Sequence, residues 1–385
     1  MHIGGTPLTW VSTYKYLGIE IHSDGKMDAA IKNLCVRGWK ATFKIRAAFK
    51  DIDVSPATKI RFFDVLVKPI ICYGSEVWGA LNNLHNSKSL DQFWNRVEKL
   101  HVENFQTKFC KNILGVHPKA SNAAVMGEVG RFPMFMYIIK TMLRYYKHIE
   151  DVKEAHPLLA VAANADKQLV GTNSWHGCLQ KILMLFGVTL NTTVPINTLI
   201  QRIIPIFKKR YIEHWKKSLG NQNENSGKLY LYRKIKTNFQ MEPYLEQVKK
   251  RKLRRALTAL RISAHRLEIE TDRYIKNKKD YVSREDRICK LCAKNGVRVM
   301  GDEEHAIMVC PSFENHRKKC MDFLHTKYPN FRTLNNHNKL IFMMTSEDES
   351  VQQVSKLVHI ILNTPRVKDK QKCPKKKTHK NNKNK

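Results

Sequence analysis

The chain has 385 residues, and its 68 lysines and arginines against 34 aspartates and glutamates give a formal net charge of +34. Such a basic surface attracts polyanions, and nucleic acids are the most abundant polyanions in cells. We therefore expect nucleic acid (RNA, DNA or a hybrid) as the partner and no small-molecule substrate, and the sequence has no apolar run near the roughly 20 residues of a membrane span.

Cysteine usage indicates a reducing compartment. The nine cysteines are odd in number, and several lie singly on apolar stretches of helical character: Cys35, Cys72, Cys110 and Cys178. This pattern is typical of buried thiols and not of a disulfide framework. The first residues also lack the pattern of a secretory signal. We expect an intracellular protein, nuclear and/or cytoplasmic.

The first predicted elements are a hairpin and a basic helix. Residues 7–23 carry β-branched and aromatic side chains in near alternation before a turn signal at 22–25, which predicts a β-hairpin packed on the next segment of the chain. Over residues 27–50, apolar side chains recur at helical spacing and basic ones fill the other faces, which predicts an amphipathic helix. Its basic outside includes Arg37, Lys40 and Lys44, which we expect to contact the phosphates of a nucleic acid.

The rest of the chain is predicted to be helical with polar breaks. Ser55 before Pro56 marks the start of a helix that runs to residue 78. Further helices are predicted at residues 90–113 (ending near Gly115), 131–149, 195–218 and 243–260. The polar, Asn-rich residues 220–227 predict a linker and domain boundary. Residues 366–385 are about half Lys and Arg, so we expect a disordered basic tail.

The predicted helix at 243–260 carries a run of cations. Its members are Lys249, Lys250, Arg251, Lys252, Arg254 and Arg255. The run indicates contacts with phosphates, although a solvated helix face or a nuclear localisation signal has the same composition. Trp39, Tyr16 and Tyr274 are candidates to stack on unpaired bases, but the helical position of Trp39 favours the core.

A metal-binding pattern stands near the end of the chain. Cys289, Cys292, His305 and Cys310 follow the spacing Cys-x2-Cys-x12-His-x4-Cys, which is typical of a zinc knuckle. Four protein ligands leave no open position, so the spacing predicts structural zinc. His316 or Cys320 could replace one ligand. The alternative is that these four residues bind no metal. A redox role for the Cys-x2-Cys pair is not indicated, because no βαβ pattern surrounds it.

Two motifs resemble a known family. Residues 14–21, YKYLGIEI, resemble the "KYLG" strand at the end of the palm in reverse transcriptases of non-LTR (LINE-type) retrotransposons. Residues 68–79, KPIICYGSEVWG, resemble the thumb helix of those proteins, and residues 260–274 with the Cys/His pattern are similar to their C-terminal knuckle region. The resemblance implies a primer-grip-like role for Tyr16, Leu17 and Gly18, and a parent activity of RNA-directed DNA polymerase.

One departure from the family bears on catalysis. Those enzymes hold two magnesium ions with palm aspartates that include an adjacent Asp-Asp pair, and this chain contains no Asp-Asp. Two-metal chemistry needs such carboxylates, so we expect no complete magnesium site and no enzyme activity of the chain on its own. Asp24 and Asp28, near the start, stand at a turn and at a helix N-terminus, which favours capping roles.

Together these patterns predict a mainly α fold. The expected divisions are a palm-end hairpin (1–25), a thumb-like helical domain (26–150), a helical connector and linker (151–225), a basic helix with the zinc knuckle (226–345), and a C-terminal helix with the disordered tail (346–385). The leading hypothesis is a noncatalytic nucleic-acid-binding remnant or fragment of a reverse transcriptase. The alternatives are the C-terminal part of an active polymerase whose palm lies upstream, and a zinc-dependent protein-interaction module.

Overall fold

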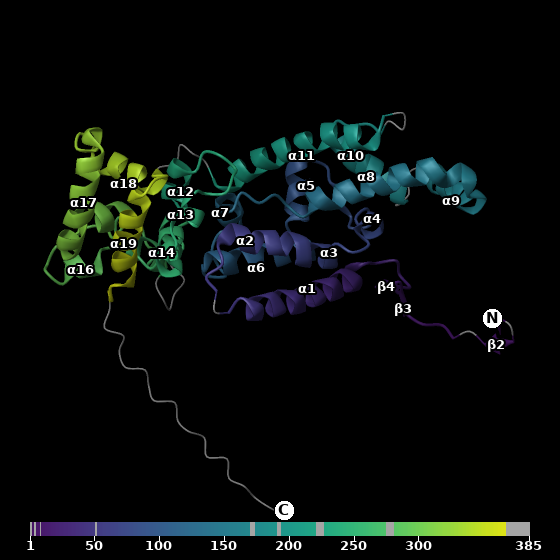
Figure 1. Cartoon of the computed structure of the whole chain (residues 1–385), viewed down its shortest axis with the longest axis horizontal. Coiled ribbons are helices and arrows are strands. Elements are labelled where there is room, and N and C mark those ends of the chain that lie inside the picture. Colours follow the sequence, from purple (N-terminus) through teal and green to yellow (C-terminus); the bar gives the residue numbers. More distant parts are fainter. Residues whose placement is uncertain are drawn as a thin grey trace, which may run out of the picture.

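The computed structural model describes residues 2–3, 5–7, 9–50, 52–169, 174–190, 194–220, 227–274 and 281–366. Within them the molecule is elongated and mainly helical (Figure 1), in agreement with the predicted fold class. A helical body comprises the described residues up to 220, and a smaller helical unit at the other end comprises those from 227. The predicted tail lies outside the described residues except for Arg366, and so does most of the predicted linker.

The body contains α1 (Asp28–Ala48), α2 (Pro56–Phe62), α3 (Lys68–Ile71), α4 (Ser75–Trp78), α5 (Leu90–Val97), α6 (His101–Leu114), α7 (Asn122–Glu128), α8 (Phe135–Val152), α9 (Pro157–Gln168), α10 (Trp175–Leu185) and α11 (Ile196–Ser218). The smaller unit contains α12 (Tyr230–Ile235), α13 (Tyr244–Gln247), α14 (Arg251–Arg261), α15 (Glu268–Thr271), α16 (Lys290–Ala293), α17 (Glu314–Lys327), α18 (Asn336–Thr345) and α19 (Ser350–Asn363). Two π-helical turns, Phe63–Val67 and His305–Val309, interrupt this α-helical pattern.

The predicted N-terminal hairpin is confirmed. Strand β3 (Thr13–Tyr16) pairs antiparallel with β4 (Ile19–His22), and a second short pair, β1 (His2–Ile3) with β2 (Thr6–Pro7), precedes it. Leu17 and Gly18 close the hairpin with positive φ angles of 46° and 85°, which matches the twist of a two-residue loop. Only part of the hairpin packs on the body, because β3 is exposed along its length.

Gly74 explains why the helix predicted to reach residue 78 is interrupted. Its φ is 71°, and a Cβ at this position would lie 2.2 Å from Cδ1 of Ile19. The left-handed backbone of Gly74 separates α3 from α4, and any side chain at this position would collide with Ile19. Tyr73 donates from its hydroxyl to the carbonyl oxygen of Leu17 at 2.9 Å. The start of the same helix is as predicted, since the Ser55 hydroxyl accepts from the Thr58 amide at 3.2 Å.

The core of the body is aromatic. Trp94 and Phe93 of α5 are fully buried, and their rings meet those of Phe135 and Phe186 edge to face. The predicted helix at 90–113 is in fact two helices, because Leu100 is extended (φ −59°, ψ 145°) between α5 and α6. The bend lets α5 bury its aromatic pair against Phe135 of α8 and against α11, while α6 packs on α1. The predicted C-terminal glycine, Gly115, has the expected left-handed backbone, with φ 68°.

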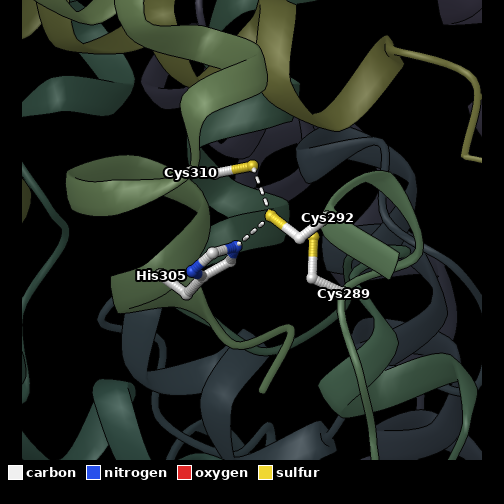
Figure 2. Close-up of side chains that lie close together, drawn as sticks. All are labelled: Cys289, Cys292, His305 and Cys310. Carbon is white, nitrogen blue, oxygen red and sulfur yellow. Dashed lines mark hydrogen bonds between the residues drawn. The ribbon is translucent and has the colours of Figure 1, made fainter. Parts of the chain in front are cut away.

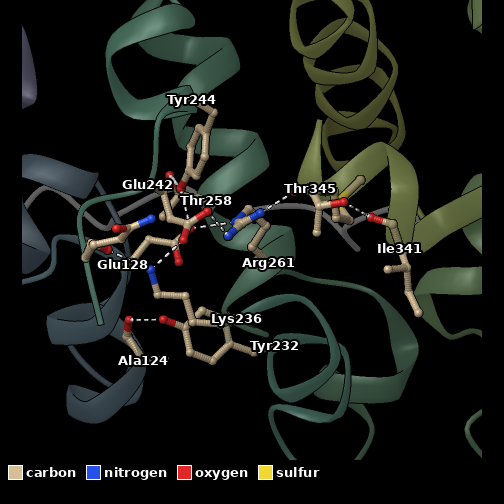
Figure 3. Close-up of polar contacts among 12 residues, drawn as sticks. Ala124, Glu128, Tyr232, Lys236, Glu242, Tyr244, Thr258, Arg261, Ile341 and Thr345 are labelled. Atoms are coloured by element: carbon tan, nitrogen blue, oxygen red, sulfur yellow. Dashed lines mark hydrogen bonds and ion pairs between the residues drawn. The ribbon is translucent and has the colours of Figure 1, made fainter. Parts of the chain in front are cut away.

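A buried ionic cluster joins the body to the smaller unit (Figure 3). Glu128, at the end of α7, is fully buried and accepts from Nε of Arg261 at 2.6 Å and from the Tyr244 hydroxyl at 2.7 Å. Arg261 is 1% exposed and also pairs with Glu242, while Lys236 pairs with Glu242 from α12's C-terminal side. The guanidinium of Arg261 thus links α14 to α7, although the two residues are more than 100 positions apart in the sequence. Charges this deeply buried require partners, so separating the two helices would be costly.

The same cluster accounts for a wrong helix prediction. The helix expected over residues 243–260 is split into α13 and α14, and Val248 between them is extended (φ −78°, ψ 95°). Tyr244 is held on the body by Glu128, and Arg254 donates to the carbonyl oxygens of Val248 and Lys249 at 2.8 and 3.3 Å. The carbonyl oxygens of Val248 and Lys249, which a continuous helix would pair with backbone amides, are therefore paired with the Arg254 side chain instead.

The cysteines of the described residues are buried thiols. All eight cysteines of the described residues are free and buried, and burial raises the pKa of the Cys35 and Cys178 thiols to about 11. Thiols with such pKa values are almost entirely protonated at neutral pH and hence weakly reactive. Among the described helices, none combines the length and the apolar character that crossing a bilayer requires.

Candidate metal centre

The first two sulfur atoms of the candidate site come from a knuckle. Cys289 donates its amide to the Val299 carbonyl at 2.8 Å and Gly301 donates to the Arg287 carbonyl at 2.8 Å, so two extended segments flank the turn. Short helix α16 begins directly after Cys289, and the Val297 amide closes the turn on the Cys292 carbonyl at 3.1 Å. This backbone brings both thiols of the Cys-x2-Cys pair to one side.

The other two side chains lie at the ends of a π-helical turn. His305 starts the turn with its amide bonded to the Asp302 carboxylate at 2.8 Å, and the Cys310 amide returns to the His305 carbonyl at 2.7 Å. Residues five apart diverge on an α-helix, but a π-helical turn closes over five residues and returns them to the same side. The side chains of His305 and Cys310 therefore lie on the same side of this turn.

The four side chains converge as the sequence predicts (Figure 2). Sγ of Cys292 lies 3.3 Å from Nε2 of His305 and 3.7 Å from Sγ of Cys310, and all four ligand atoms lie within 4.8 Å of one another. In a tetrahedral zinc site with zinc–sulfur bonds of about 2.3 Å, neighbouring sulfur atoms are about 3.8 Å apart. All four residues are buried, so the cluster could hold a metal such as zinc.

The electrostatics of the cluster distinguish its thiols. Burial raises the pKa of Cys289, but hydrogen bonds from His305 and from the backbone amides of Cys292 and Leu291 outweigh it, so the net pKa is lowered. Burial and the neighbouring sulfur atoms of Cys310 and Cys289 raise the pKa of Cys292. Three sulfur atoms this close repel one another as thiolates, and a divalent cation at their centre removes that repulsion.

Surrounding groups fix the knuckle in place. Glu268, which is 1% exposed, accepts from the Lys290 amide at 3.3 Å and from Arg366 at 3.0 Å. A Cβ at Gly301 would lie 2.7 Å from Oε2 of Glu268 and 3.0 Å from Cα of Cys289, so only glycine fits there. Nδ1 of His305 is buried and has no hydrogen-bond partner among the described residues, which leaves this ring held by packing and by its Nε2 neighbours.

The alternative ligands lie elsewhere. Cys320 is buried within α17 and does not join the cluster, and burial raises its thiol pKa to about 12. His316 is exposed on the same helix and is likewise outside the cluster. Cys289, Cys292, His305 and Cys310 are therefore the set that the structure brings together.

The predicted nucleic-acid contacts are scattered. Arg37, Lys40 and Lys44 are exposed on α1, and so are Lys249, Lys250, Arg251, Lys252 and Arg255 around the start of α14. Arg254 differs, because it is 6% exposed and bonded to backbone carbonyls, so it cannot reach a phosphate. Arg255 packs beside Gly115, at the C-terminal end of α6, where a cation is favourable.

The predicted cations of α1 lie on a different face of the helix from the cations that line a groove nearby. At 100° per residue, Arg37, Lys40 and Lys44 project from the side of α1 opposite to Thr42 and Arg46. Thr42 and Arg46 instead line a groove together with Lys59 of α2 and Arg251 of α14. Sequence reasoning missed Arg46, Lys50 and Lys59 as candidate contacts, because no local signal shows that three separate segments meet at one edge.

The resemblance-derived residues lie at the tip of the hairpin. Tyr16 and Leu17 are exposed, Leu17 to 73%, and Gly18 accepts weakly from Arg37 at 3.5 Å through its carbonyl oxygen. Trp39 lies against Phe105 with ring centroids 4.3 Å apart, which agrees with its predicted place in the core. Asp24 accepts from the Lys26 amide at 2.9 Å and serves the turn, as expected for a capping residue.

A scan against protein-family models, a search of curated proteins and a search of solved structures each found no match to this chain.

Proposed function

We propose that the chain is a noncatalytic nucleic-acid-binding protein that contacts mainly phosphates. The observation that carries this proposal is the meeting of Arg46, Lys50, Lys59 and Arg251 at one groove. None of the four forms an ion pair with another described residue, and the pKa of Lys59 is lowered by burial and then by the charges of Arg251 and Arg254. Unpaired cations at close range repel one another, and a polyanion relieves that repulsion.

Zinc has a structural role in this proposal. Cys289, Cys292, His305 and Cys310 supply four ligand atoms, so a bound ion has no open position for a substrate or an activated water. All four side chains belong to the segment between α15 and α17, so a bound ion would close that segment on itself and hold its two Cys- and His-bearing turns together. The metal contributes to folding and takes no part in chemistry.

The motifs YKYLGIEI and YGSEVWG support a more specific form of the proposal, a remnant or fragment of a LINE-type reverse transcriptase. The chain has no Asp-Asp pair, so we expect no polymerase activity from it alone. Primer extension on an RNA template with magnesium and nucleotides should give no product. Template-dependent extension that a chelator abolishes would show that the chain is catalytic.

Salt dependence of binding tests the proposal. Affinity for a fluorescent single strand is measured by anisotropy across a series of salt concentrations, with the unaltered chain and with a variant carrying Arg46→Ala, Lys59→Ala and Arg251→Ala. If each cation neutralises one phosphate, the triple substitution should reduce the slope of log affinity against log salt by about 2, since a single strand gives about 0.7 per phosphate.

Two comparison variants make this test specific. Lys318 and Lys319 are exposed on α17, far from α1 in Figure 1, so replacing both with alanine should leave the slope unchanged. Replacing Lys40 and Lys44 measures whether the opposite face of α1 also binds. If neither RNA nor DNA binds at low salt, the proposal is wrong, and the exposed hairpin then favours the protein-interaction alternative.

A further inference from the structure

An open groove of ≈ 510 Å³ lies where the C-terminal end of α1 meets α2, α6 and the first residue of α14. Its floor is apolar, because Phe63 and Val67 are each 1% exposed and Phe109 is 9% exposed. Phe49 and Phe62 are half-buried and form a wall, with ring centroids 4.8 Å apart. The groove is within the size range of sites that take small organic groups, roughly 300–1,000 Å³.

The rim of the groove is cationic. Arg46 lies in the last turn of α1 and Lys50 follows the helix end, Lys59 is half-buried on α2, and Arg251 stands at the first position of α14. Asp53 is the one acidic side chain among the lining residues, and its carboxylate lies 3.8 Å from Arg254. The rim therefore keeps an excess of positive charge around an aromatic interior.

We propose that this groove takes an unstacked base of a single-stranded nucleic acid, whose neighbouring phosphates lie on Arg46, Lys59 and Arg251. The inference rests on the proposed function and adds a site and a strand preference to it. Bases stack on aromatic side chains whatever their identity, since each base has a π-face, and cations beside the ring hold the backbone. The Phe49–Phe62 wall and the rim offer these two elements within one groove.

An acidic peptide with an aromatic anchor is the competing occupant. The observations favour nucleic acid because the chain carries +34 in total and because three further exposed cations, Lys249, Lys250 and Lys252, flank Arg251 in the sequence. A strand with a phosphate at every nucleotide can use this many cations, whereas a peptide needs only the few charges beside its anchor. A duplex is a poorer occupant, since its bases remain stacked inside it.

Two probes of equal length separate base binding from phosphate binding. Oligothymidylate and its abasic analogue carry the same phosphates, and their affinities for the full chain are measured side by side by fluorescence anisotropy. We expect oligothymidylate to bind about 5- to 150-fold more tightly, which corresponds to stacking of a single base on an aromatic surface. A duplex of the same length should show no such gain.

Substitutions in the wall locate this gain. In Phe49→Ala and Phe62→Ala the ratio of the two affinities should fall towards one, while the salt slope stays as in the unaltered chain. Phe43 lies on α1 outside the groove and is 57% exposed, so Phe43→Ala should keep the full ratio. Circular dichroism checks that each variant is folded, and because the ratio is measured within one variant, a partly unfolded fraction does not change it.

The outcomes distinguish the groove from the general function. Equal affinity for the two probes, or a ratio that Phe49→Ala and Phe62→Ala leave unchanged, overturns the base-binding groove while salt-dependent binding still supports the proposed function. If the unaltered chain binds neither probe at low salt, both the base-binding groove and the proposed function are wrong. If a peptide of alternating glutamate and tyrosine binds in a manner that depends on Phe62 and the probes bind equally, the groove belongs to a protein partner and our inference is wrong.

Discussion

Removing the guanidinium of Arg261 should destabilise the protein far more than removing an exposed one. In Arg261→Ala, the Tyr244 hydroxyl remains as the donor to the Glu128 carboxylate within the described residues, because the second carboxylate oxygen of Glu128 already has no hydrogen bond. Glu242 retains Lys236, but the Met344 carbonyl also loses its donor. Breaking a buried pair in this way costs about 3–5 kcal/mol, a large share of a typical folding free energy of about 5–15 kcal/mol.

Two spectroscopic signals follow the unfolding of Arg261→Ala in urea. All six tryptophans precede residue 220, so their fluorescence reports the body alone, whereas far-ultraviolet circular dichroism reports all helices. We expect the free energy of unfolding to fall by about 4 kcal/mol, with the dichroism signal changing at lower urea than the fluorescence if the smaller unit separates first.

A matched control and a rescue test the cause. Arg298 is exposed and lies 2.7 Å from Asp286, so Arg298→Ala should cost less than about 1 kcal/mol. The rescue uses Arg261→Met, which keeps an apolar side chain of similar length. The double variant Glu128→Gln/Arg261→Met removes the unpaired carboxylate charge of Glu128, and its free energy of unfolding should exceed that of Arg261→Met by more than about 1 kcal/mol. If Arg261→Ala costs no more than Arg298→Ala, the ionic cluster does not hold the two parts together and our reasoning is refuted.

Three further predictions concern the metal and a buried acid. Cys292→Ser should lose zinc, because a hydroxyl is a poor ligand at neutral pH, whereas Cys320→Ser should keep one zinc per chain; mass spectrometry of the intact protein decides, and full occupancy in Cys292→Ser would remove the site. Zinc affinity should fall as pH is lowered, since the Cys292 thiol, whose pKa is raised, must lose its proton to bind; competition with a chelator at several pH values measures this, and a pH-independent affinity would contradict it. Burial raises the pKa of Glu103 to about 8, although the Met134 and Phe135 amides lower it, so the folded chain holds a proton that the unfolded chain releases near pH 4.5. Stability should therefore decline between about pH 5 and 8, and Glu103→Gln should flatten that decline; an unchanged slope in thermal unfolding would rule this out.

The fold was predictable wherever its signals are local. Ser55 and Gly115 cap helices through their own side chain or backbone, and both helix ends were predicted. The hairpin was predicted as an element, but its loop at Leu17 and Gly18 was not, because the turn signal in the sequence lies at residues 22–25. The breaks at Leu100 and Val248 have no such signal. They arise because neighbouring segments are held by distant partners, as Tyr244 is by Glu128, and periodicity along the chain does not encode those partners.

The candidate site shows the same division. Cysteine and histidine spacing located all four members of the cluster, because a metal imposes short loops between its ligands. The π-helical turn that aligns His305 with Cys310 was not predicted, since its residues have no distinctive composition. The groove was also missed, because Arg46, Lys59 and Arg251 are brought together only by the packing of α1, α2 and α14.

The ionic cluster has a consequence for the energetics of recognition. Arg261 stands at the end of the helix whose first residue is Arg251, and it fixes that helix to the body through Glu128. The cations contributed by α14 and by α1 are therefore held at a set separation before any ligand arrives. Association then loses little conformational entropy on the protein side, so the free chain is pre-organised and most of the ordering cost falls on the flexible strand that binds it.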